Sequence, residues 1–393
     1  MKGKIRMTER LYYDASYMTE FTAYVTAARE KDGGHWVTLN RSAFYPTSGG
    51  QPFDTGTLTR LDAGEVFSVT GVEVMDGDVW HRMEGTLSPG DEVKGKIDWE
   101  RRFDHMQQHG GEHMIAGTVW KLLQGTTIGL HLGKEESSID VTMPDGRTRF
   151  TLEEIAAVER HVNRHIQRNE PIRCWFPDEE ELKELPLRKP PTVTEHIRIV
   201  DIGGWEMVAC GGTHPAATGE IGLVKILSVT PARGKARVSF VCGERALRYF
   251  DLCQKSAEKA GQLLSVTPDA LADAVSEMKE KCARLESEQK TFRVGDLLRR
   301  LEENGGVLYL AEGDDKALQE AVSLYIAKDG RAALTGAGNR LIFARSKDRT
   351  EDMAALLRSV ARGGGKPDMA SGAGGKEAIL SAAESIGLSG IRL

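Results

Sequence analysis

Two segments, QHGGEHMIAG at residues 108–117 and ACGGTHPAATGEIG at residues 209–222, decide how this chain must fold. Each carries two candidate metal ligands four residues apart: His109 and His113 in the first, Cys210 and His214 in the second. Two histidines at i and i+4 lie on one face of a helix. Imidazole nitrogen and thiolate sulfur are ligands that zinc takes in tetrahedral sites. We therefore predict that the fold brings these distant segments together around one zinc ion.

Size and composition indicate a protein of several domains from a reducing compartment. The chain has 393 residues, 40% of them hydrophobic, enough for two or three globular domains. Its five cysteines are an odd number without the spacing of a disulfide framework, so we expect a cytoplasmic protein. No secretory signal and no membrane span is predicted, since no apolar run is long enough. The net charge of −6 does not favour a nucleic-acid partner, although a local basic face could still serve one.

Periodicity divides the chain into four regions and predicts an α+β protein. Residues 1–95 alternate short β segments with turns, such as KDGG at 31–34, which is typical of a small β-barrel. Residues 96–243 mix helices and strands and form the α+β core that carries the candidate ligands. Residues 244–303 form a charged helical linker with an apolar heptad seam, which predicts a helical hairpin within one chain or a coiled coil between two. Residues 304–393 alternate strands and helices as a small α/β domain does.

Two glycine-rich segments carry further candidate residues. FYPTSGGQPFDTG at 44–56 predicts a rigid turn that fixes the amide of Gln51, a plain barrel turn being the alternative. ARGGGKPDMASGAGG at 361–375 is not a phosphate-binding P-loop, because Pro367 stands where that loop needs Ser or Thr. A flexible linker is the plain alternative. We expect instead an exposed, RNA-gripping loop made of Arg362, Gly363, Gly364, Gly365 and Lys366.

The segment around Glu112 allows a second interpretation. His109, Glu112 and His113 spell H-x-x-E-H, a pattern of zinc peptidases in which Glu112 would be the general base. A peptidase would take a downstream Glu as third ligand, whereas this chain offers a cysteine loop. Otherwise we expect Glu112 to face solvent, because its side chain lies to the side of the histidine face. The glycines at 110–111 cost about 1 kcal/mol each of helix propensity, which indicates that something approaches the helix backbone closely there.

Taken together, HGGEH, CGGTHPAATGEIG, FYPTSGGQP and GGGKPDMASGAGG resemble the editing half of alanyl-tRNA synthetase. The chain is similar to the long form of the freestanding alanyl-tRNA editing proteins, the AlaX family. The resemblance covers nearly the whole chain and implies a barrel, an editing core, a helical linker and a C-terminal DHH-associated domain. It leaves no place for a class II aminoacylation domain, so it implies editing in trans.

The resemblance also implies roles for individual residues. The ligands of the family's zinc fall on His109, His113, Cys210 and His214. Gln51 would belong to the editing pocket together with Cys210, and Ser42 stands where the family usually has Thr. Separately, a basic face for RNA around the core could be formed by Arg101, Arg102, Lys225, Arg233, Lys235 and Arg237.

The implied activity is hydrolysis of Ser-tRNA(Ala) and Gly-tRNA(Ala). A synthetase pocket sized for alanine cannot exclude glycine, and it rejects a hydroxyl-bearing isostere by only about a hundredfold. Zinc would activate water near the ester or, if all four ligands bind at once, position the substrate. Ser42 and Gln51 would hydrogen-bond the serine hydroxyl. A zinc peptidase, or a non-catalytic tRNA-binding module with a structural zinc, are the alternatives, and a homodimer could form through the helical linker or the C-terminal domain.

Overall fold

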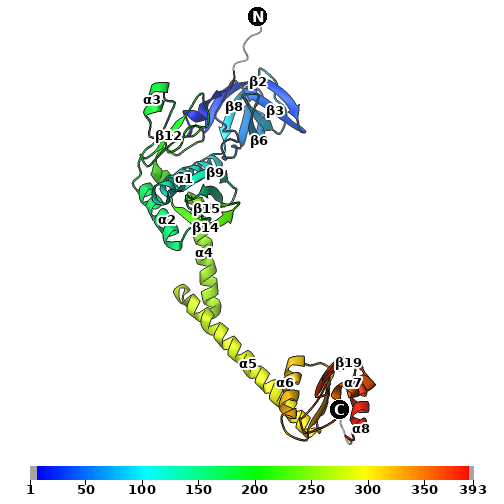
Figure 1. The fold of residues 1–393 in the computed structure, drawn as a ribbon. Helices are drawn as coiled ribbons and strands as arrows, with labels where there is room; N and C mark the ends of the chain where they lie inside the picture. Colours follow the sequence, from blue (N-terminus) through cyan, green and yellow to red (C-terminus); the bar gives the residue numbers. More distant parts are fainter. Residues whose placement is uncertain (1–6, 389–393) are drawn as a thin grey trace. The chain divides into compact units, whose positions relative to one another are not determined.

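The computed structural model describes residues 7–388 and contains two compact units. The first unit ends at Ser256 and the second begins at Ala257, so the division falls within helix α4 (Gly243–Leu264). Figure 1 colours the first unit from blue to green and the second from yellow to red. The mixed α+β class predicted from the sequence is confirmed. Within residues 7–388, every helix is too short or too polar to cross a membrane.

The first unit begins with six antiparallel strands that close on one another as a barrel. They are β2 (Glu20–Lys31), β3 (Gly34–Leu39), β5 (Gly56–Arg60), β6 (Val66–Met75), β7 (Asp78–Met83) and β8 (Glu92–Ile97). Hydrogen-bonded neighbours follow the order β2-β3-β7-β6-β5-β8, and β8 pairs back to β2. Asp32 and Gly33 have φ values of 51° and 69°, the geometry of the tight hairpin turn predicted between the first two strands. The short strands β1 (Glu9–Arg10) and β4 (Arg41–Ser42) pair in parallel, with the 3₁₀ turn η1 (Leu11–Tyr13) after β1.

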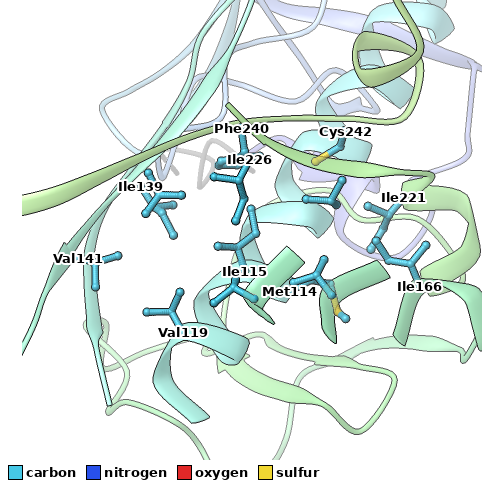
Figure 2. Close-up of a cluster of buried hydrophobic side chains, with 14 of the residues drawn as sticks. Met114, Ile115, Val119, Ile139, Val141, Ile166, Ile221, Ile226, Phe240 and Cys242 are labelled. Atoms are coloured by element: carbon cyan, nitrogen blue, oxygen red, sulfur yellow. The ribbon is translucent and has the colours of Figure 1, made fainter. Parts of the chain in front are cut away.

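Helix α1 (Trp99–Leu123) is the central element of the first unit. It begins where the Asp98 carboxylate accepts a hydrogen bond from the backbone N–H of Arg101, a side-chain N-cap. From His105 to Val119 it is buried on all sides, so it must be enclosed by other elements. Met114, Ile115 and Val119 pack into the apolar cluster of Figure 2, beside side chains from several strands.

Two sheets and three further helical segments follow α1 in the chain, and strands of both sheets, α2 and η2 contact it. The four-stranded sheet has the order β14-β15-β10-β9 and consists of β9 (Thr126–Leu132), β10 (Ser137–Thr142), β14 (Val224–Ala232) and β15 (Lys235–Cys242). The three-stranded sheet consists of β11 (Ile172–Trp175), β12 (Ile199–Ile202) and β13 (Glu206–Ala209). The helical segments are α2 (Leu152–Gln167), α3 (Glu179–Glu184) and the 3₁₀ turn η2 (Thr218–Ile221).

The close approach predicted at the two helix glycines is confirmed. A Cβ on Gly110 would lie 2.9 Å from Cγ1 of Ile221, and one on Gly111 would lie 2.2 Å from Sγ of Cys242. These contacts let η2 and β15 lie directly against α1. Because η2 follows the cysteine loop in the chain, the same contact holds that loop against the helix.

The second unit is a five-stranded sheet between two layers of helices. The strands are β16 (Val307–Leu310), β17 (Ala332–Ala337), β18 (Arg340–Arg345), β19 (Arg362–Gly365) and β20 (Met369–Ala373), in the order β16-β17-β18-β20-β19. The helices are α5 (Leu271–Glu303), which follows the 3₁₀ turn η3 (Pro268–Ala270), and α6 (Asp315–Ile326), α7 (Met353–Val360) and α8 (Lys376–Ser385). Neighbouring side chains of β17 point to opposite faces, so Ala333 packs with α5 and α6 whereas Leu334 packs with α7 and α8.

The glycine-rich segment expected to be a loop is instead an edge strand, β19. It pairs antiparallel with β20, with Gly363 opposite Gly372. A Cβ on Gly363 would lie 2.5 Å from the carbonyl oxygen of Ser371, so glycine here permits close strand pairing. Arg362 and Lys366 at its two ends are exposed.

The apolar seam predicted along residues 271–292 is helical, but it is not covered within the described chain. Its large side chains Val275, Met278, Leu285 and Phe292 are between 41% and 77% exposed. The buried positions of α5 lie near its C-terminal end, at Val294, Leu297 and Leu301. Pairing of the seam with a second chain stays a prediction.

Candidate metal centre and cavity

The four predicted metal ligands converge on one point. His109 and His113 project from α1, while Cys210 and His214 come from the loop that follows β13. One ligand atom from each lies within 4.8 Å of the others. Sγ of Cys210 is 3.4 Å from Nε2 of His109 and 3.4 Å from Nε2 of His214. Tetrahedral zinc with ordinary bond lengths separates sulfur and nitrogen ligands by roughly 3.6 Å, so the spacing fits such an ion.

The hydrogen bonding of these side chains also fits a metal. His113 is 4% exposed, and neither of its ring nitrogens has a hydrogen-bond partner among residues 7–388. Nδ1 of His214 is likewise buried without a partner in this part of the chain. Buried polar atoms normally have partners because leaving them unpaired is costly. A cation at the centre would satisfy Nε2 of His113, and three imidazoles with one thiolate are a donor set suited to zinc.

Burial sets the protonation of the ligands. It lowers the pKa of His109 to about 3 and the pKa of His113 and His214 well below the ordinary value, so the rings are neutral and can donate lone pairs. Burial raises the pKa of the Cys210 thiol to about 12. The thiol therefore ionises at neutral pH only when a cation is bound next to it.

Gln51 orients one ligand rather than facing the cavity. Its Oε1 is 2.9 Å from Nδ1 of His109 and accepts a second bond, of 3.2 Å, from the backbone N–H of Thr213. Its Nε2 donates to Oγ1 of Thr213 at 2.8 Å. Because an amide oxygen only accepts, Nδ1 of His109 must carry the proton, which leaves Nε2 free for the metal. The amide is fixed, as the sequence indicated, and its oxygen accepts from two donors, so the contact with a serine hydroxyl, which stays a prediction, would use the second N–H of Nε2.

A buried ion pair fastens the turn that carries Gln51 to α1. Gly49 and Gly50 at its tip have φ values of 58° and 87°, and Ser48 bridges to Gln51. Further along the turn, both carboxylate oxygens of Asp54 are 3.0 Å from Nε of Arg102, and both side chains are 0% exposed. The ion pair thus joins the turn to the helix about two helical turns before His109, the first ligand.

The cysteine loop depends on a glycine and on an arginine that the sequence analysis missed. A Cβ on Gly212 would lie 2.2 Å from Cε1 of His109, whereas one on Gly211 would meet nothing closer than 3.8 Å. Neither glycine has a positive φ, so close approach to His109, and not backbone conformation, explains Gly212. Arg198 donates to the carbonyl oxygens of Cys210 at 3.1 Å and Gly212 at 2.9 Å. The sequence did contain a signal for this role, because Arg198 is the one arginine in the otherwise largely apolar segment HIRIVDI at residues 196–202.

The ligand cluster lies in a cavity of about 770 Å³ within the first unit. His109, His113 and Cys210 contribute to its wall. Aromatic side chains contribute too, and Tyr13 and Phe176 meet edge to face at 5.7 Å. Its cationic lining comprises Arg10, Arg188, Lys189 and Arg198. The cavity therefore combines a metal-type cluster, aromatic surfaces and positive charge, which suits an anionic ligand that carries a ring.

Glu112 lies in this cavity, which corrects the expectation that it faces solvent. Its side chain is 10% exposed, and Oε2 is 3.9 Å from Nε2 of His113. Burial raises the pKa of its carboxyl to about 7, against the opposing charge of Arg188. The helix does direct Glu112 away from the face that carries the histidines, but on that side the side chain lines the cavity and is not exposed to bulk water.

Ser42 lies in the barrel and is not part of the cavity wall. It is 0% exposed, its Oγ is 2.7 Å from Nε2 of His81, and it accepts from the backbone N–H of Phe44. Nδ1 of His81 is 3.2 Å from the carbonyl oxygen of Val37 and must donate to it. The hydroxyl therefore donates to Nε2 of this neutral histidine. The hydroxyl thus already has a donor and an acceptor within the protein, and its contact with a substrate hydroxyl stays a prediction.

Three of the six residues of the predicted basic face pair with carboxylates. Arg102 is buried with Asp54, Arg237 pairs with Asp140 at 2.7 Å, and Lys225 pairs with Glu159 at 3.0 Å. Arg101 donates to the carbonyl oxygen of Phe53. Arg233 is exposed at the turn between β14 and β15, and Lys235 is half-buried beside it. The remaining candidates for RNA contact, Arg362 to Lys366, belong to the second unit.

Comparison with known proteins relates this chain to the tRNA synthetases. The family profile described as "tRNA synthetases class II (A)" matches residues 5–101. The profile "Threonyl and Alanyl tRNA synthetase second additional domain" matches residues 197–239, which contain the cysteine loop. The alanine–tRNA ligases of Pyrococcus abyssi, Pyrococcus furiosus and Archaeoglobus fulgidus are 31%, 32% and 34% identical over 93%, 93% and 95% of this chain. The chain spans about two fifths of their length, 42%, 42% and 43%.

Proposed function

This chain is related to the alanyl-tRNA synthetases over most of its length, and we propose that it is an aminoacyl-tRNA deacylase. Its substrates are tRNA(Ala) molecules mischarged with serine or glycine, and the bond it hydrolyses is the ester to the terminal ribose. It acts in trans on tRNA charged by another enzyme and carries out no aminoacylation itself. This is the editing function that a pocket sized for alanine requires, because such a pocket cannot reject glycine or serine well enough.

The observation that carries the proposal is the ligand cluster in the wall of an accessible cavity. His109, His113, Cys210 and His214 would hold zinc, which supplies a positive charge beside the ester; it would lower the pKa of a bound water only with a ligand position open to that water. The chain's own residues hold the rest of the site in place: Gln51 fixes one imidazole, and Arg198 fixes the cysteine loop. Both contacts exist before substrate enters, so the site is preorganised for a small acyl ester.

The cavity lining supports a nucleotide ester as substrate. Lys189 and Arg10 supply positive charge for the terminal phosphate, and Phe176 supplies an aromatic surface that is 43% exposed. Further from the site, Arg233 and Lys235 and the edge strand from Arg362 to Gly365 are the proposed contacts for the tRNA backbone. Such contacts predict that tRNA binding weakens steeply as salt is raised.

One rival function is favoured by a specific observation. Four protein ligands complete a tetrahedral shell, which is the pattern of structural zinc. A non-catalytic tRNA-binding module would use zinc only to join the loop to α1, and it would bind tRNA(Ala) without turnover. The zinc-peptidase alternative lacks such support, because the third and fourth ligand positions hold Cys210 and His214 and no carboxylate.

Deacylation assays on charged tRNA(Ala) test the proposal. We expect the wild type to release serine and glycine faster than alanine, and Cys210→Ala to lose both zinc and activity. Cys282→Ala, an exposed cysteine of α5, is the control and should retain both. Tight tRNA binding with no turnover would establish the binding-module alternative, and casein cleavage lost in Glu112→Gln would establish the peptidase. Formation of Ala-tRNA(Ala) from alanine and ATP would refute the absence of aminoacylation.

A further inference from the structure

One acidic group of the cavity has no role in holding the metal site. The side chain of Glu112 is nine-tenths buried and belongs to the cavity wall. No donor among residues 7–388 forms a hydrogen bond with its carboxylate; the closest charged or ionisable nitrogen is Nε2 of His113, at 3.9 Å. Burying a carboxylate without a hydrogen bond or a cation is unfavourable, so this position calls for a partner that the protein itself does not supply.

Two cations lie near Glu112, and neither forms an ion pair with it: Lys189 is an exposed residue of the cavity wall, and Arg188 is already paired elsewhere. Nε of Arg188 donates to Oε1 of Glu206 at 2.6 Å, and both of these side chains are at least 95% buried. Nη1 of Arg188 donates to Oγ1 of Thr127 at 2.9 Å. Arg188 is thus paired with Glu206 and forms no hydrogen bond with Glu112. The Glu112 carboxylate therefore faces the cavity without a bonded cation.

An aminoacyl ester brings the missing cation. Serine, glycine and alanine esters share one positively charged group, the α-ammonium, attached to the carbon next to the ester carbonyl. An ester carbonyl placed at the ligand cluster would set this ammonium within a few ångströms of the cluster. The Glu112 carboxylate, 3.9 Å from a ligand nitrogen, lies in the same zone. An ammonium there would donate charge-assisted hydrogen bonds to an otherwise unpaired acceptor.

We propose that Glu112 binds the α-ammonium group of the esterified amino acid. This inference rests on the proposed function and names the residue that recognises the feature common to all its substrates. Because alanine carries the same ammonium, Glu112 contributes affinity and orientation and does not discriminate serine or glycine from alanine. It does distinguish aminoacyl esters from esters whose α-substituent is a neutral hydroxyl.

The test compares two substrates in two proteins. Ser-tRNA(Ala) and its α-hydroxy analogue, made by nitrous-acid deamination of the same charged tRNA, are hydrolysed by the wild type and by Glu112→Gln. The readout is the ratio of kcat/KM for the amino ester to kcat/KM for the hydroxy ester. This ratio does not depend on the folded or zinc-loaded fraction of either protein, and comparing it between proteins cancels the intrinsic reactivity of the esters.

We expect the ratio to fall roughly ten- to hundredfold in Glu112→Gln, the range for hydrogen bonds to charged groups. The loss should be the same for Ser-tRNA(Ala) and Gly-tRNA(Ala). Calorimetric binding of the non-hydrolysable amide 3′-deoxy-3′-(serylamino)adenosine should weaken by a similar factor, while its glyceroyl counterpart binds both proteins alike. If Glu112 is instead the base for water, both esters lose activity together and the ratio is unchanged, which would overturn the inference. A wild type that hydrolyses neither ester contradicts the proposed function itself.

Discussion

Replacing Gln51 by alanine separates the metal-orienting role of this side chain from a role in binding substrate. The change removes the acceptor for two buried donors, Nδ1–H of His109 and the backbone N–H of Thr213. Each buried donor left unpaired costs about 1–3 kcal/mol. Loss of a partner that orients a metal ligand lowers metal affinity about 10–100-fold, which corresponds to roughly 1.4–2.7 kcal/mol. We therefore expect zinc affinity to fall within that range.

The assay is zinc competition against a chromophoric chelator, with urea unfolding of the metal-free protein in parallel. Gln108→Ala is a matched control, because Gln108 is also 0% exposed and its amide also makes three hydrogen bonds, two with the backbone of Cys242 and one with Asp104. It should destabilise the fold and leave zinc affinity near the wild-type value. Gln51→Glu keeps an acceptor towards Nδ1 and should bind zinc within a few-fold of wild type. Equal zinc affinities for Gln51→Ala and wild type would refute the orienting role.

Three further predictions follow from the packing. Gly212→Ala places a Cβ 2.2 Å from Cε1 of His109 and should reduce zinc affinity. Gly211→Ala places a Cβ with no atom closer than 3.8 Å and should leave zinc affinity unchanged. Zinc competition against a chelator measures the affinity of both variants, and equal affinities would contradict the prediction. Burial lowers the pKa of His81 to about 4, so the unfolded chain gains this proton below about pH 6.5 while the fold keeps the ring neutral. Acidification from pH 7 to 5 should therefore remove about 2 kcal/mol of stability through His81 alone, in addition to the loss from the other buried histidines. Urea unfolding of His81→Phe at both pH values should show that loss reduced, and an unchanged loss contradicts the assignment. Ser42→Ala should lower the free energy of unfolding by about 1 kcal/mol and leave the ratio of Ser-tRNA(Ala) to Ala-tRNA(Ala) hydrolysis unchanged. A changed ratio would show that Ser42 contributes to substrate selection.

The sequence predicts what depends on local spacing. The i, i+4 spacing of His109 and His113 puts both on one face of a helix, and the turn signal at residues 31–34 marks the first hairpin. The helix-propensity cost of Gly110 and Gly111 was informative as well. It predicted a close approach to the helix, and Ile221 and Cys242 are the residues that make it. In each case the information lies within a few residues of the chain.

What the sequence could not predict depends on which groups meet across the fold. A rigid turn fixes Gln51, but nothing local shows that its amide ends on Thr213 and His109. A helical wheel turns Glu112 away from the histidines, but it does not show that a cavity wall covers that side. For β19, glycine composition suggested a loop, while pairing with β20 made a strand. Tertiary contacts override local preference at each of these positions.

The barrel therefore supports the metal centre, although the four ligands all come from segments outside the barrel. The turn after β4 carries Gln51 to His109, and the buried pair of Asp54 with Arg102 fixes that turn on the helix that supplies two ligands. Arg198 extends the same arrangement, since it holds the carbonyls of the cysteine loop and also donates to the carbonyl oxygen of Tyr13, next to the barrel. A metal centre built from the helix and the loop alone would leave the tautomer of His109 unset. With the turn in place, the His109 ring is held in the tautomer that can bind a metal through Nε2 before the metal binds. The position of the turn, which the barrel sets, therefore contributes to the metal affinity of the site.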